Sequence, residues 1–196
     1  MREATHLETL VISGDDITEI EGLDTLTNLK DLYISGGFTE ISGLDNLKNL
    51  HKLDIYGKKI TEISGLDNLT NLTYLSLSGN KIAEIKGLED LKNLEVLLLI
   101  ENQITEIKGL ENLKNLRTLD LSNNKITEIK GLESLKNLKS LYLADNEITE
   151  INGLWGLWNL LHLDLRGNPG GDLYNYEDDY SLFDVLTGRS RNIQYY

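Results

Sequence analysis

Leucine and isoleucine recur along most of the chain in one order that repeats every 22 residues. The clearest copy is LRTLDLSNNKITEIKGLESLKN at residues 116–137, with aliphatic residues at positions 1, 4, 6, 11, 14, 17 and 20. The second copy alone is one residue shorter. The eight copies begin at Leu7, Leu29, Leu50, Leu72, Leu94, Leu116, Leu138 and Leu160. A fixed period of this length predicts a repeat protein whose units stack on one another.

Each copy opens with the pattern LxxLxL, which predicts a short β-strand. Side chains alternate between the two faces of a strand, so the leucines lie on one face and the residues between them on the other. One unit cannot bury its own leucines, and we therefore expect neighbouring strands to stack about 4.8 Å apart in a parallel sheet. The predicted fold is an α/β repeat solenoid with this sheet on its concave side.

The second half of each copy, ITEIxGLxxL, is too short for a long helix and predicts short 3₁₀-type turns on the convex side. Its recurrent turn residue is a glycine, at Gly22, Gly43, Gly65, Gly87, Gly109, Gly131 and Gly153. An asparagine closes each copy, where we expect a residue that tolerates left-handed geometry. The closing residues are Asn49, Asn71, Asn93, Asn115, Asn137 and Asn159, with Asn28 in the first copy.

A second set of asparagines occupies position 9 in the last five copies. They are Asn80, Asn102, Asn124, Asn146 and Asn168. An inward carboxamide at this position can satisfy buried main-chain groups of adjacent loops, so we expect an asparagine ladder. Copies 1 to 3 have Asp15, Gly37 and Lys58 there instead.

Repeats of the form LxxLxLSxNKITEIxGLExLxN resemble leucine-rich repeats of the 22-residue class, whose best-known member is the leucine-rich regulatory subunit of protein phosphatase 1. Bacterial internalins share the period, but their return segment typically carries proline where this chain has glycine. The resemblance covers residues 7–196 and implies a leucine-rich repeat horseshoe that embraces a globular partner. Because leucine-rich repeats serve unrelated partners, it implies no particular binding residue.

The two ends of the chain depart from the repeat. We expect one domain over residues 1–196, closed by a C-terminal helical cap at 169–196 that covers the last apolar face. Residues 172–184 carry five carboxylates and no Lys or Arg, which indicates either solvation of the cap or an acidic docking patch for a basic partner. At the N-terminus, either polar residues blunt an exposed edge, or a partner, a second copy or further sequence covers it.

Candidate binding residues lie between the leucines, at positions 3, 5 and 7, because these side chains project from the concave face. Val96, Leu98 and Ile100 make repeat 5 apolar where the fold does not require it, flanked by Tyr33, Tyr56, Tyr74 and Tyr142. This is the composition of a binding hot spot, although apolar residues on a strand also simply favour strand formation. A second candidate cluster for a basic or hydroxyl-rich group consists of Asp120, Tyr142, Asp164, His162 and Arg166.

Composition narrows the function classes. The net charge of −13 argues against general binding to nucleic acid or to an anionic membrane surface. With no cysteine, the chain has no disulfide, thiolate metal site or thiol nucleophile, and the N-terminus lacks the apolar core of a secretory signal. The three histidines fall in separate repeats, and no nucleotide-binding or zinc-protease motif occurs. We expect a soluble, cytoplasmic monomer without metal or cofactor.

The function that follows is a non-enzymatic protein–protein interaction module that binds a partner protein on its concave face as a regulatory or scaffolding subunit. Three narrower possibilities stay open from the sequence. The chain is a regulatory subunit of a metallophosphatase catalytic subunit, an internalin-like surface adhesin, or a repeat segment of a larger signalling protein.

Overall fold

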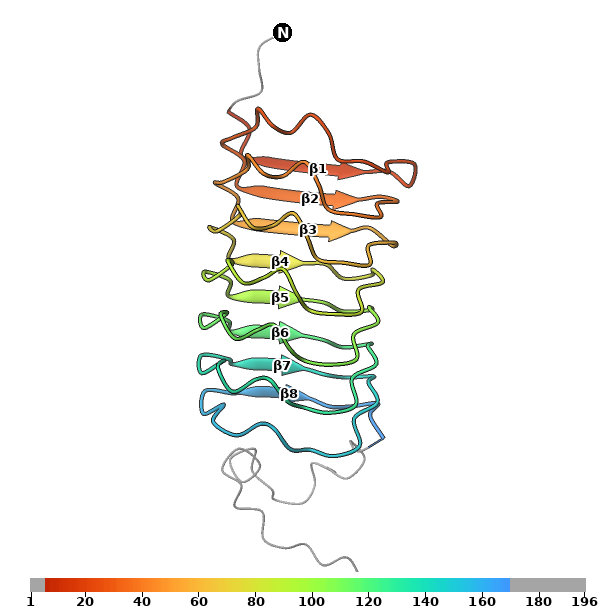
Figure 1. The fold of residues 1–196 in the computed structure, drawn as a ribbon, viewed down its shortest axis with the longest axis vertical. Coiled ribbons are helices and arrows are strands. Elements are labelled where there is room, and N and C mark those ends of the chain that lie inside the picture. The colour runs from red at the N-terminus through yellow and green to blue at the C-terminus, as the bar shows by residue number, and fades with distance from the viewer. Residues whose placement is uncertain (1–5, 170–196) are drawn as a thin grey trace, which may run out of the picture.

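The structure is a computed structural model and describes residues 6–169. Each repeat contributes one strand that starts at position 3 of the repeat. The strands are β1 (Thr9–Ser13), β2 (Asp31–Ser35), β3 (Lys52–Tyr56), β4 (Tyr74–Ser76), β5 (Val96–Leu98), β6 (Thr118–Asp120), β7 (Ser140–Tyr142) and β8 (His162–Asp164). All eight form one parallel sheet in sequence order, which confirms the predicted repeat solenoid (Figure 1).

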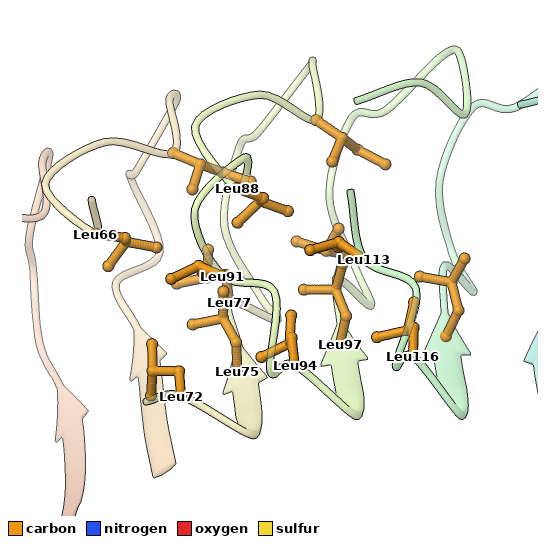
Figure 2. Close-up of a cluster of buried hydrophobic side chains, with 14 of the residues drawn as sticks. Leu66, Leu72, Leu75, Leu77, Leu88, Leu91, Leu94, Leu97, Leu113 and Leu116 are labelled. Atoms are coloured by element: carbon orange, nitrogen blue, oxygen red, sulfur yellow. The ribbon is translucent and has the colours of Figure 1, made fainter. Parts of the chain in front are cut away.

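The register of the sheet places equal repeat positions side by side. Leu97 of β5 pairs with Leu75 of β4 on one side and with Leu119 of β6 on the other. The leucines on the inner face of the sheet pack against aliphatic residues of the return segments, as Figure 2 shows for Leu75 and Leu97 with Leu91 and Leu94. Burial is complete in the middle of the stack because every repeat there has a neighbour on both sides.

Each return segment runs through two successive turns closed by hydrogen bonds between residues i and i+3. In repeat 4, Leu91 N donates to Leu88 O at 3.1 Å and Leu94 N donates to Leu91 O at 3.0 Å. The recurrent glycine precedes these turns with a positive φ, 73° at Gly87, and a Cβ on it would lie 2.6 Å from Ile63 O of the preceding repeat. Glycine is required there both for its backbone conformation and for this close approach.

The position-9 asparagines form the expected ladder. The Asn102 amide group donates to three carbonyls, Leu77 O at 3.0 Å, Leu99 O at 3.1 Å and Ile100 O at 3.2 Å. Its carbonyl oxygen accepts from Ile82 N at 3.0 Å. Every such asparagine therefore joins its own repeat to the preceding one, and all five are buried.

The asparagines that close each repeat do not adopt the left-handed backbone geometry that we expected from the sequence, so this expectation is wrong. Among residues 6–169, the non-glycine residues with positive φ are Lys58, Glu101, Asn123 and Asp145, and no closing asparagine is one of them. Instead Asn93 donates from its side-chain amide to Thr70 O at 2.9 Å, and Asn49, Asn71, Asn115, Asn137 and Asn159 make the equivalent bond. They form a second, exposed ladder.

The two ends differ from the centre. In repeat 1, Leu7, Leu10 and Ile12 are only partly buried because nothing in residues 6–169 covers β1. The predicted C-terminal cap lies outside the described residues apart from Pro169. No helix in the part of the chain that the structure describes has the length and apolarity to cross a bilayer.

Candidate functional site on the sheet face

The outer face of the sheet carries the side chains at positions 3, 5 and 7, as the leucine pattern predicts. On β5 and in the two residues after it, Leu97 and Leu99 are completely buried, whereas Val96, Leu98 and Ile100 are half-buried. These three form an apolar row at the middle of the eight-stranded sheet. In register beside them on β6 lie Thr118, next to Val96, and Asp120, next to Leu98.

The tyrosines lie on strands to either side of this apolar row. Tyr56 and Tyr74 come from the adjacent strands β3 and β4, and Tyr56 is 40% exposed. The Tyr56 ring lies directly over Gly79, where a Cβ would collide with it. Tyr74 is on the strand next to β5, whereas Tyr142 on β7 is two strands away, as Tyr56 is, and Tyr33 on β2 is three strands away. The aromatic flank is therefore closer on the N-terminal side.

Two features near the apolar row depend on burial. Partial burial raises the pKa of the Tyr74 hydroxyl above its ordinary value of 10.0, and the nearby Asp54 carboxylate adds to this shift. The Ser78 hydroxyl, between Tyr56 and Ile100 in the position-7 column, is buried and has no hydrogen-bond partner among the described residues. A sequence column of Tyr, Ser and Ile does not indicate whether the serine hydroxyl is solvated.

The second predicted cluster comes together in register on β6, β7 and β8. Asp120 pairs with Tyr142, and Tyr142 pairs with Asp164. The Arg166 guanidinium binds the Asp164 carboxylate through two hydrogen bonds of 2.9 and 2.6 Å and lowers the pKa of that carboxyl. His162 is exposed on the same strand. Asp120 is thus the carboxylate of this cluster without an ion-pair partner among residues 6–169.

Among residues 6–169, the serine, histidine and aspartate side chains nearest one another on this face do not form a hydrogen-bonded triad. Ser140 lies beside His162 in register, but the Asp164 carboxylate is bound to Arg166. Within residues 6–169, no group of three or more His, Asp or Glu side chains is placed to hold a metal ion. Unexpectedly, His6 and His51 line one shallow polar pocket with Glu8 and Lys30, and these last two form an ion pair of 2.8 Å.

Sequence reasoning missed one exposed apolar group away from the sheet face. Trp155, Trp158 and Leu161 lie in and after the return segment of repeat 7 and are 60%, 62% and 66% exposed. The sequence does contain an indication of this group. The other copies of the repeat have charged or polar residues at the same three positions.

Comparison with protein families matches "Leucine Rich repeats (2 copies)" in five overlapping or successive segments, residues 27–68, 48–91, 70–101, 92–134 and 136–173. A comparison with curated protein sequences gives no match, so no homologue supports the narrower resemblance to a phosphatase regulatory subunit.

Solved structures with the same fold include two internalins of Listeria monocytogenes. Internalin C2 is 32% identical over 87% of this chain and 79% of its own, with a TM-score of 0.78. The internalin InlF is 28% identical, with 84% of this chain and 62% of its own covered and a TM-score of 0.57.

TLR13, solved in complex with ssRNA13, is 29% identical over 81% of this chain, with a TM-score of 0.66, but the match covers only 24% of TLR13. The chain thus spans most of internalin C2 and progressively smaller parts of the other two proteins. From the repeat spacing, the asparagine ladder and these matches, the chain belongs to the leucine-rich repeat family.

Proposed function

We propose that this chain is a non-enzymatic protein-binding module whose partner contacts the outer face of the sheet around β5. Leucine-rich repeat domains typically act as protein-interaction modules, which supports the general function. The observation that carries the site is the half-buried row Val96, Leu98 and Ile100 at the centre of the sheet. Apolar side chains that the core does not use gain free energy when a partner covers them.

The surroundings of the row suit a partner with an apolar anchor and basic or hydroxyl groups beside it. Tyr56 and Tyr74 offer large rings with few rotatable bonds, which lose little entropy on binding. Asp120 lies in register next to Leu98. A basic group on the partner that reaches Asp120 gains a charge-assisted hydrogen bond at the edge of the apolar contact.

The test is affinity capture from the source organism with the wild-type chain and the triple variant Y74A/L98A/I100A. Proteins that bind this site should be lost from the variant by tenfold or more, equivalent to about 1.4 kcal/mol. The matched control is T9A/V11A/S13A on β1, which truncates residues of the same three columns, positions 3, 5 and 7, at the edge of the sheet. Circular dichroism must show that both variants stay folded. Equal capture by all three chains would refute the site.

An internalin-like surface adhesin is the second candidate, favoured by the 32% identity and TM-score of 0.78 to internalin C2. It differs from the first in where the protein acts and not in which face binds. Cell fractionation decides between them, because the adhesin requires the chain at the cell surface and the cytoplasmic regulator requires it in the soluble fraction.

The phosphatase-regulator version of the first candidate has no support from the comparisons. Its test is co-purification with a metallophosphatase catalytic subunit, and the sheet-face proposal does not depend on the result.

A further inference from the structure

Three of the five exposed large hydrophobic residues among the described residues lie together in the segment that leads into β8. Trp155, Trp158 and Leu161, here called the tryptophan corner, are 60%, 62% and 66% exposed. They occupy repeat positions 18, 21 and 2, three residues apart, so their side chains emerge on the same side of two successive turns. The chain has only two tryptophans, and both are here.

The same three positions are polar in nearly every other repeat. Position 18 is Asp24, Asp45, Asp67, Glu89, Glu111 and Glu133, position 21 is Thr27, Lys48, Thr70, Lys92, Lys114 and Lys136, and position 2 is Glu8, Lys30, His51, Thr73, Glu95, Arg117 and Lys139. Position 18 and position 21 stay exposed even in repeats with a neighbour on each side. Stacking another repeat onto β8 therefore does not cover the tryptophan corner, and whatever covers it approaches from the side.

The corner is bordered by basic side chains of the preceding repeat. Lys136 Nζ donates to Gly156 O at 3.4 Å, between the two tryptophans in sequence. Lys139 is the position-2 neighbour of Leu161, whose main-chain N–H donates to Lys139 O at 2.8 Å. Within residues 6–169, neither lysine has a carboxylate partner, in contrast to Arg117, which pairs with Glu95. A ligand of this corner should combine apolar or aromatic residues with negative charge.

We propose that residues 172–184 of this same chain, DLYNYEDDYSLFD, bind the tryptophan corner from the side. The segment holds five carboxylates and four aromatic residues, with no Lys or Arg, and so complements the corner in both respects. In each regular repeat nine residues carry the chain from the position-9 asparagine to position 18 at this corner. Because the segment begins four residues after Asn168 in repeat 8, directly after the repeat that carries Trp155 and Trp158, the intervening chain is long enough for it to reach the corner.

Selectively excited tryptophan fluorescence of the full chain reports on the surroundings of the tryptophan corner, since the chain's two tryptophans are Trp155 and Trp158. We expect emission shifted to the blue relative to free tryptophan, together with protection from acrylamide quenching. Neutralising the segment in D172N/E177Q/D178N/D179N should shift emission to the red and raise the quenching constant about twofold, as the rings return to water. Salt at 1 M should act in the same direction, because it shortens the Debye length to about 3 Å.

Matched controls separate binding at the corner from a change in overall charge or folding. D24N/D45N/D67N/E89Q removes the same number of carboxylates at position 18 of the first four repeats and should leave the emission unchanged. K136Q/K139Q should reproduce the effect of the acidic-segment variant, whereas K48Q/K92Q should not. Circular dichroism must be equal for all of these chains.

Three results would overturn the proposal. The first is wild-type emission already at the value of free tryptophan, which would leave the corner to a separate partner. The second is blue-shifted emission that neither the acidic-segment variant nor salt changes. The third is quenching that depends on protein concentration, which would identify a second copy of the chain as the occupant.

Discussion

Repeats 1 to 3 and repeats 4 to 8 follow one leucine pattern but are held together differently. In repeats 4 to 8, a buried asparagine bonds each loop to the one before it, and the strands are three residues long. Repeats 1 to 3 have no such asparagine, and their strands continue for five residues. Apolar stacking therefore suffices to place a strand, and the shorter strands occur in the repeats that carry the asparagine ladder.

In the N-terminal repeats, two other interactions take the place of the asparagine ladder. In the shortened repeat 2, the Phe38 ring is 1% exposed and lies against Gly36, where a Cβ would be 2.7 Å from the ring. In the exposed loops, Lys58 of repeat 3 reaches across repeat 2 to Asp15 of repeat 1, with Nζ and Oδ1 2.8 Å apart. Repeats 1 to 3 thus have apolar packing and one exposed ion pair in place of the three or four hydrogen bonds that each ladder asparagine makes in repeats 4 to 8.

The largest loss of stability is expected from removing a ladder asparagine at the centre of the solenoid. Asn102→Ala removes four hydrogen bonds and leaves Ile82 N and at least one carbonyl buried without a partner. Each unsatisfied buried group costs about 1 to 3 kcal/mol, so we expect a loss of about 3 kcal/mol in the free energy of unfolding. Urea denaturation followed by circular dichroism measures it.

Lys58→Ala is the control for Asn102→Ala, because it truncates the same repeat position where no ladder exists. Its effect should stay below about 0.5 kcal/mol, as for an exposed side chain. Similar losses for the two variants would contradict the distinction between the two halves of the solenoid.

A smaller difference in the loss of unfolding free energy is expected between alanine substitutions at two glycines of the return segments. Gly87→Ala places a methyl group 2.6 Å from Ile63 O at a φ of 73°, so both strain and a main-chain collision oppose it. At Gly22, φ is 75°, but a Cβ there would meet nothing within 4 Å, since no repeat precedes repeat 1 among the described residues. We expect about 1 to 2 kcal/mol for Gly22→Ala from strain alone and at least 1 kcal/mol more for Gly87→Ala.

Thermal melts of the two alanine variants at equal pH measure this difference. Equal losses would mean that the glycines are required only for their backbone conformation and not for the contact between repeats.

The smallest effect concerns Asp15 and Lys58. The hydrogen bond and charge of Lys58 lower the pKa of the Asp15 carboxyl below its ordinary value of 3.8. Because the folded pKa is the lower one, the pair's contribution to stability is present above pH 3.8 and is lost as pH falls through the folded value. Titration of the Asp15 carboxyl carbon by NMR should show its pKa rising to about 3.8 in Lys58→Gln.

High salt should raise the pKa of Asp15 in the wild-type chain in the same direction, since both groups are exposed. An unchanged pKa in Lys58→Gln would mean that another group, and not Lys58, stabilises the Asp15 carboxylate.

Sequence periodicity predicts the strands, the sheet order and the asparagine ladder because each depends on residues that recur at one repeat position. It predicts less where a side chain acts on a neighbour that the pattern does not specify. The closing asparagines illustrate this, since Asn93 donates to Thr70 O of the preceding repeat and does not adopt left-handed geometry. The placement of the Tyr56 ring over Gly79 depends on packing between two different positions, which no single column contains.

The candidate site also combines features that follow from repeat positions with features that depend on side-chain packing. The row Val96, Leu98 and Ile100 departs from what its columns contain elsewhere in the sequence, and in the structure its three side chains are half-buried on and just after β5. Binding of a partner at this row stays a prediction. Repeat positions do not predict the pairing of Asp164 with Arg166, because it depends on side-chain rotamers. The same holds for the Ser78 hydroxyl, which has no hydrogen-bond partner among residues 6–169.

The asparagine ladder also bears on how such a chain changes length in evolution. Each ladder asparagine bonds to its own repeat and to the one before it, and the groups it meets are the same from repeat 4 to repeat 8. Deleting or duplicating one whole unit in this stretch presents an identical asparagine to an identical loop and orphans no hydrogen bond. Repeats can therefore be gained or lost one at a time, and each change adds or removes one strand of the sheet. The width of the sheet face can in this way be matched to the size of a partner.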